Sequence, residues 1–120
     1  ADLSYRDLPG VDVSNARLRQ ADLSLATMNG ADFSGAELSV ANLFGARFTG
    51  ADFRRADLTR ASAVGAYFGG ADLTGASLEG ANLSGAELGT ARRLTQSQLN
   101  AACGDRHTRL PDGLTILPCR

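Results

Sequence analysis

Residues 21–60 read ADLSL-ATMNG-ADFSG-AELSV-ANLFG-ARFTG-ADFRR-ADLTR. The first residue of every block is Ala, and the third is Leu, Met or Phe. The same five-residue spacing extends from Leu3 to Leu88, and all eighteen residues at this spacing are apolar. Arg6 and Val11 are early exceptions to the small first residue. This strict repeat is the dominant feature of the chain.

A period of five matches neither a strand, which has a period of two, nor a helix, which has a period of 3.6. Short tandem repeats are typical of stacked solenoids. If each unit forms one side of a square coil, four units close a coil of 20 residues, and Gly suits the corners at the fifth position. We therefore predict an all-β solenoid of about four and a half coils over residues 1–90.

The pattern Ala-(Asp/Asn)-Leu-X-X resembles the pentapeptide-repeat family over three quarters of the chain. The resemblance implies a right-handed quadrilateral β-helix, and it supplies the handedness that the period alone does not give. It implies no single activity, because the family includes DNA mimics that bind DNA gyrase, bacterial effectors and members without a known role.

The charge balance excludes some classes of function. The formal net charge is −1, with 12 Lys and Arg residues against 13 Asp and Glu residues. A strong nucleic-acid footprint would need a basic surface, and a strong DNA mimic would need an acidic one. No apolar run reaches the length of a membrane-spanning helix. We expect no direct nucleic-acid partner, no membrane insertion and no cofactor.

Residues 20 apart should lie above one another in the stack. This register places Phe48 over Phe68 and Phe33 over Phe53 inside the coils. Ala63 is the one small residue among the central core positions, and we expect neighbouring Phe rings to fill the space it leaves. Residues 1–15 are the least regular units. They predict an end that is fragile, continues upstream or pairs with another chain.

The same register defines polar features on the outside. One column consists of four carboxylates: Asp12, Asp32, Asp52 and Asp72. We expect local N–H groups, solvent and nearby Arg residues to neutralise them, and the alternative is a weak cation site or a docking stripe for a basic partner. A group of basic side chains in the middle coils is best explained as a solvated face with acidic neighbours: Arg47, Arg54, Arg55 and Arg60.

An outward apolar cluster is the strongest candidate for a binding surface. Phe44 and Val64 share a column, Leu25 belongs to the preceding coil, and Tyr67 lies around the corner from Val64. Clustered apolar residues on a surface mark an interface or a covered site. A protein partner and the chain's own tail are equally good candidates for the cover.

The period ends at Ala91, so we assign residues 91–120 to a C-terminal cap. Thr95 and Gln98 form a capping box, and Leu94 and Leu99 form a hydrophobic staple. Gly104 is suited to terminate the helix. We therefore predict a short capping helix over residues 95–103, followed by an extended apolar tail.

Cys103 and Cys119 are the only cysteines. A bridge between them would close a loop of about 15 residues and contribute roughly 3 kcal/mol. Two free thiols, or a metal pair with His107, are the alternatives, although a structural metal site needs four ligands. The tail also resembles one found on some bacterial pentapeptide-repeat proteins, which favours the bridge. A bridge predicts a periplasmic or otherwise exported protein; free thiols would predict a cytoplasmic one.

No catalytic constellation is evident. A Cys103–His107 pair lacks a third orienting group and a pocket, and no phosphate loop or metal site is present. We predict a non-enzymatic structural or protein–protein interaction module. The alternative, from the resemblance alone, is a DNA mimic that binds DNA gyrase.

Overall fold

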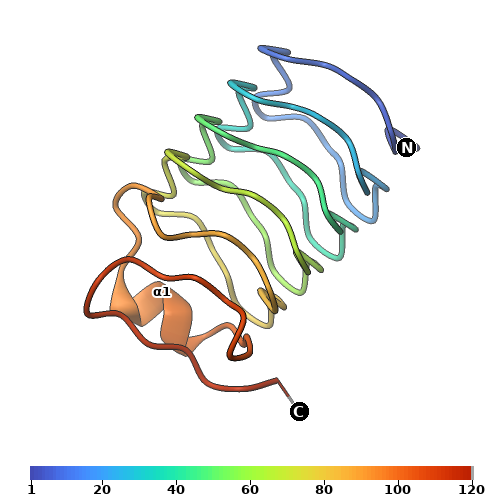
Figure 1. Ribbon diagram of the computed structural model, residues 1–120. Coiled ribbons are helices and arrows are strands. Elements are labelled where there is room, and N and C mark those ends of the chain that lie inside the picture. The colour runs from blue at the N-terminus through green and yellow to red at the C-terminus, as the bar shows by residue number, and fades with distance from the viewer. Residues whose placement is uncertain (120) are drawn as a thin grey trace.

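The computed structural model describes residues 1–119, and Arg120, the last residue of the predicted cap, lies outside the described residues. The chain forms a rod of stacked, four-sided coils, with the N-terminus at one end and the cap at the other (Figure 1). Parallel β-bridges join residues 20 apart, from Asp2–Asp22 through to Asp72–Arg92. Each side of a coil contributes one bridging residue, the second residue of its unit.

Backbone hydrogen bonds explain why the units stack with this register. The Leu23 N–H donates to the Asn42 carbonyl in the next coil at 2.8 Å, and the Leu25 N–H donates to the Phe44 carbonyl at 2.8 Å. Within each corner, a turn closes the side, as when the Ala26 N–H donates to the Leu23 carbonyl. The backbone of every coil is thus paired along the rod, as buried polar groups require.

The corners require a left-handed backbone conformation at the fifth position. All ten glycines expected there have positive φ, between 64° and 70°. Non-glycine residues occupy the same conformation at other corners, where it is sterically costly. Val40, with φ 59°, is the β-branched example.

The core consists of the two inward residues of each unit. Phe33 stacks on Phe53 at a centroid distance of 4.8 Å, and Phe48 stacks on Phe68 at 5.4 Å, as the column register predicts. The expectation that Phe rings fill the space beside Ala63 is wrong. An apolar cavity of about 10 Å³ remains there, with Phe68 in its wall, because the other Phe rings pack against each other in neighbouring coils.

The cap contains one helix, α1 (Gln96–Asn100). Thr95 is its N-cap, and both halves of the Thr95–Gln98 capping box are present, as predicted. The predicted extent of 95–103 is wrong at the C-terminal end, where Ala101 is the C-cap. Gly104 does not terminate the helix. The chain leaves the helix early because the segment after it pairs with the last coil.

That pairing extends the stack beyond the repeats. Cys103 bridges to Asn82 and Arg109 bridges to Glu87, at separations of 21 and 22 residues instead of 20. Leu99 is fully buried. The α1 helix therefore fills the end of the rod, and the tail adds one further paired layer (Figure 1). Within residues 1–119, no helix has both the length and the apolar character needed to cross a bilayer.

Candidate protein-interaction surface

The apolar ridge, which we define as Leu25, Phe44, Val64 and Tyr67, lies at one corner of the stack and the side next to it. Phe44 is 48% exposed, Leu25 is 42% exposed and Tyr67 is 43% exposed, whereas Val64 is half-buried. The Leu25 N–H donates to the Phe44 carbonyl, and the Gly45 N–H donates to the Val64 carbonyl at 2.9 Å. The stacking register thus brings three of these residues into consecutive coils.

Glycine at position 45 makes this packing possible. A Cβ atom at Gly45 would lie 2.7 Å from Cδ2 of Leu25, which is closer than non-bonded carbon atoms approach. Leu25 therefore lies directly over the Gly45 backbone. Tyr5, one coil earlier in the column of Leu25, is 75% exposed and extends the apolar surface toward the N-terminal end. Sequence reasoning missed Tyr5, although the 20-residue register places it there.

Arg47 adds one charge beside the ridge. Its guanidinium carbon lies 4.9 Å from the centroid of the Tyr67 ring, a cation–π arrangement. The bridge between Arg47 and Tyr67 sets this contact, because it places the two side chains one above the other. No carboxylate of residues 1–119 lies within ion-pairing distance of Arg47. The sequence prediction of a solvated basic face did not include this contact between Arg47 and the Tyr67 ring.

Charge is unevenly distributed around the rod. Residues 21–80 contain eleven charged side chains, and the register assigns each to a side or corner. Nine belong to the two sides opposite the ridge, which are formed by residues 31–40, 51–60 and 71–80. Only Asp22 and Arg47 belong to the two sides that meet at the ridge. This depletion is confined to the middle coils, because Glu87 bridges to Tyr67 from the next coil. Within the middle coils, a low density of charge around exposed aromatic residues is the composition of an interface core.

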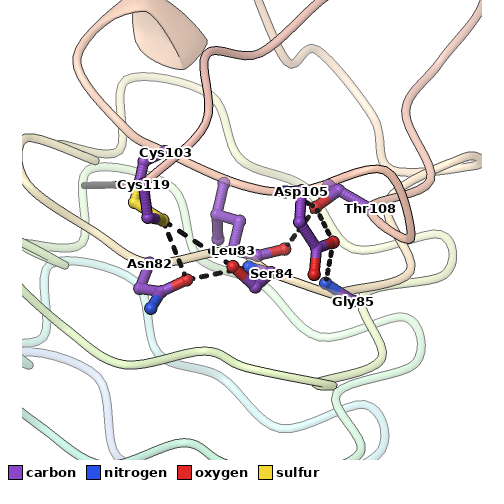
Figure 2. Close-up of a disulfide and its surroundings, with 8 residues drawn as sticks. All are labelled: Asn82, Leu83, Ser84, Gly85, Cys103, Asp105, Thr108 and Cys119. Carbon is purple, nitrogen blue, oxygen red and sulfur yellow. Dashed lines mark hydrogen bonds between the residues drawn. A yellow bond between two sulfur atoms is a disulfide. The ribbon is translucent and has the colours of Figure 1, made fainter.

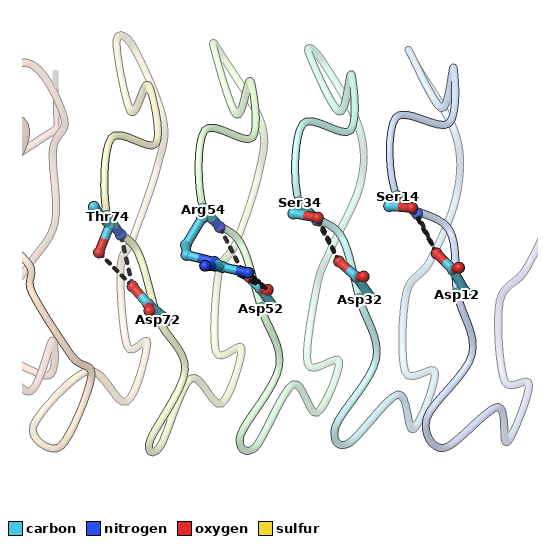
Figure 3. A network of polar contacts seen from close by, with 8 residues as sticks. All are labelled: Asp12, Ser14, Asp32, Ser34, Asp52, Arg54, Asp72 and Thr74. Carbon is cyan, nitrogen blue, oxygen red and sulfur yellow. Dashed lines mark hydrogen bonds and ion pairs between the residues drawn. The ribbon is translucent and has the colours of Figure 1, made fainter.

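The carboxylate column lies on one of the charged sides (Figure 3). Each carboxylate accepts a hydrogen bond from the backbone N–H two residues later, for example Ser14 N–H to Asp12 at 3.0 Å. The hydroxyl of Ser14 lowers the pKa of Asp12 below its ordinary value of 3.8, and the hydroxyl of Thr74 lowers that of Asp72. Each carboxylate is therefore stabilised locally.

Arg54 neutralises the central carboxylate of this column directly. Its Nη2 lies 2.8 Å from Oδ2 of Asp52, and its Nε donates to the same carboxylate. These hydrogen bonds lower the pKa of Asp52. Within residues 1–119, no group of three or more His, Cys, Asp or Glu residues is arranged to hold a metal ion.

A disulfide joins Cys103 and Cys119, whose Cα atoms are 4.8 Å apart (Figure 2). The Cys119 sulfur lies 3.3 Å from Oδ1 of Asn82 in the last repeat coil. The sulfur of Cys103 is bonded, so it is no nucleophile for His107, which is exposed.

Two side chains near the disulfide fasten the loop around His107 to the last repeat coil. The Gly85 N–H donates to Asp105, and the Thr108 hydroxyl donates to the Leu83 carbonyl (Figure 2). The disulfide and these contacts together hold the tail against the end of the rod.

Solved structures with this architecture come from several sources. A pentapeptide repeat protein from Nostoc Pcc 7120 is 26% identical with a TM-score of 0.68, over 95% of this chain and 77% of that one. One from the Arabidopsis thaliana thylakoid lumen is 29% identical with a TM-score of 0.48, over 98% and 71%. Full-length QnrB1, a plasmid-mediated fluoroquinolone resistance protein, is 19% identical with a TM-score of 0.47, over 98% and 75%.

The Nostoc structure supports the right-handed quadrilateral β-helix as the fold of this chain. A search of curated proteins gave no match. The family model for pentapeptide repeats matches in eight copies, over residues 1–35, 21–60, 36–75 and 51–89. These matches span most of the chain, which therefore belongs to the pentapeptide-repeat family.

Proposed function

We propose that this protein is an exported, non-enzymatic interaction module that binds a protein partner through the apolar ridge. One observation carries the proposal: Phe44 is 48% exposed, at a corner whose two adjoining sides carry almost no charge in the middle coils. Pentapeptide-repeat proteins are generally non-enzymatic structural repeat proteins, which supports this part of the proposal.

The tail is an unsuitable cover for the ridge. Its partly buried residues Leu110, Leu114 and Ile116 pack against the core, and its paired layer lies on the last coil. The ridge residues keep their exposure with the tail in place. A partner is then the remaining reason for a clustered apolar surface beside polar neighbours.

The Cys103–Cys119 bond supports export, because disulfides persist in oxidising compartments and are reduced in most cytosols. A thiol count on protein from its native cells, alkylated before denaturation, tests this part. If no free thiol is detected, export is supported. Two alkylated thiols per chain would contradict export and favour the cytoplasmic alternative.

Photo-crosslinking in native cells tests the binding surface. A photoreactive residue at the Tyr5 position reports a partner on the ridge, and Phe44→Glu should abolish the crosslinked product by placing a charge in the apolar contact. Val40→Glu is the matched control, because Val40 is 43% exposed at a different corner from Phe44, where a charged side ends. Both variants should retain the circular dichroism spectrum. Equal crosslinking by the two variants would refute the ridge as the binding surface.

The gyrase-binding DNA mimic remains the competing proposal, and the carboxylate column bears on it. A DNA mimic needs a continuous negative surface. Here Arg54 pairs with Asp52 in the middle of the column, and Arg92 follows Asp72 in the bridging register. A DNA supercoiling assay with purified gyrase discriminates: we expect no effect of this protein, and inhibition or protection would favour the mimic.

A further inference from the structure

We infer that the partner segment received by the apolar ridge is acidic, with a carboxylate placed on Arg47 next to an apolar side chain placed on Phe44. The inference rests on the proposed function and adds the chemistry of the partner. Phe44 and Arg47 are three residues apart on one coil, and Arg47 lies over the ring of Tyr67, itself a ridge residue. A partner that covers Phe44 and Tyr67 therefore also covers the Arg47 guanidinium.

Covering a cation has an energetic consequence. A guanidinium removed from water without a counter-charge loses hydration free energy in an apolar interface, whereas a carboxylate forms charge-assisted, bidentate hydrogen bonds with it. Arg47 has no such carboxylate among residues 1–119. A basic partner would add repulsion to this desolvation cost. A carboxylate on the partner is therefore the group that offsets this cost most fully.

The Arg47 side chain is also pre-organised to bind a carboxylate. The cation–π contact with the Tyr67 ring restrains the Arg47 side chain, so less side-chain entropy is lost when a carboxylate binds. Arg54 is the useful contrast. It lies on the side with the carboxylate column, and its Nη2 is 2.8 Å from Asp52 in the same coil. Arg54 completes a charge pair within the chain, whereas Arg47 presents its charge beside exposed aromatic rings.

A phage-displayed library of random dodecapeptides, selected on the disulfide-intact full chain, tests the inference. We expect enrichment of peptides with Asp or Glu within a few residues of an aromatic or Leu side chain. For the best peptide, measured by fluorescence anisotropy, Arg47→Ala should weaken binding roughly tenfold or more. Arg55→Ala is the matched control, because Arg55 is an exposed Arg at the corner between the two charged sides. It should leave the affinity unchanged.

Charge reversal gives a second readout. Selection on Arg47→Glu should shift enrichment from acidic to basic peptides while keeping the apolar residue, provided that the variant retains its circular dichroism spectrum. Phe44-dependent peptides without a carboxylate, or an Arg47→Ala affinity equal to wild type, would overturn the acidic partner and leave the ridge as a binding surface. No Phe44-dependent peptide at all would overturn both proposals.

A second copy of this chain is the other candidate to cover the apolar ridge. Sedimentation of the purified protein over a range of concentrations tests it directly. We expect a monomer, or an association that Phe44→Glu leaves unchanged. A dimer that dissociates in the Phe44→Glu variant would assign the ridge to self-association and overturn the inference.

Discussion

Reduction of the disulfide should loosen the cap while leaving the middle of the rod intact. The two ends of the disulfide are held differently. The Cys103 N–H donates to the Ala81 carbonyl at 2.9 Å, and its carbonyl accepts from the Leu83 N–H at 2.7 Å. The Cys119 N–H has one bond, to the Gly104 carbonyl at 3.2 Å. Reduction thus releases the Cys119 end, and Cys103 stays in the stack.

The magnitude follows from the length of the closed loop. Cys103 and Cys119 are separated by 16 residues, for which the chain-entropy relation gives about 3 kcal/mol. Because about 1.4 kcal/mol corresponds to a factor of ten, the population of the opened tail should rise roughly 100-fold on reduction. In a solenoid, each coil contacts only its neighbours, so this change should stay local.

Native-state hydrogen exchange with and without a phosphine reductant measures this opening. The Gly104 N–H, which donates to the Leu117 carbonyl at 2.9 Å, should exchange roughly 100-fold faster after reduction. The Phe53 N–H, bonded to the Asp72 carbonyl at 2.8 Å, is the internal control and should not change. Unchanged exchange at Gly104, or an equal increase at Phe53, would refute the local-cap reasoning.

Three further perturbations test the coils. Val40→Gly should stabilise the protein by up to about 1 kcal/mol, because it removes a β-branched side chain from positive φ; a lower urea midpoint would contradict this. Ala63→Val places two more carbon atoms beside a cavity of only about 10 Å³, so overpacking should lower the stability by about 1 kcal/mol, and a higher melting temperature would show that the neighbouring side chains make room. Asp12, Asp52 and Asp72 have lowered pKa values when folded, so their stabilisation is complete above the unfolded value of 3.8 and is lost as the pH falls through the folded values. The melting temperature should therefore be flat from about pH 5 to about pH 7 on their account and fall below about pH 4, and a fall that begins near neutral pH would point to other groups.

The repeat region was predictable because its structure is determined by a local pattern. One inward pair per five residues specifies the side of a coil, and the 20-residue register then places Phe33 on Phe53 without further information. The capping box at Thr95 was equally local. What the pattern did not reveal was packing quality. The cavity beside Ala63 depends on the side-chain conformations of the rings in adjacent coils, which the 20-residue register does not specify.

The cap was harder to predict because its register is not repeated in the sequence. Cys103 pairs with Asn82 at a separation of 21 residues, and Arg109 pairs with Glu87 at 22. These pairings shorten α1, since residues after Ala101 gain more from hydrogen bonds to the last coil than from another helical turn. The contact of Arg47 with the Tyr67 ring was missed for a different reason. The 20-residue register places the two side chains one above the other, but the charge of Arg47 alone predicts only a solvated face.

Because every coil has four sides of five residues each, a surface residue can face only one of four directions around the rod. Insertion of 20 residues between Phe44 and Val64 would lengthen the rod by about 4.8 Å and leave both residues at the same corner. Insertion of five residues would turn everything after the insertion by one side of the square and move Val64 to the next corner. Tandem duplication of five-residue units can therefore move a binding surface around the rod in quarter turns. The core is not disturbed, because each unit contributes the same inward pair.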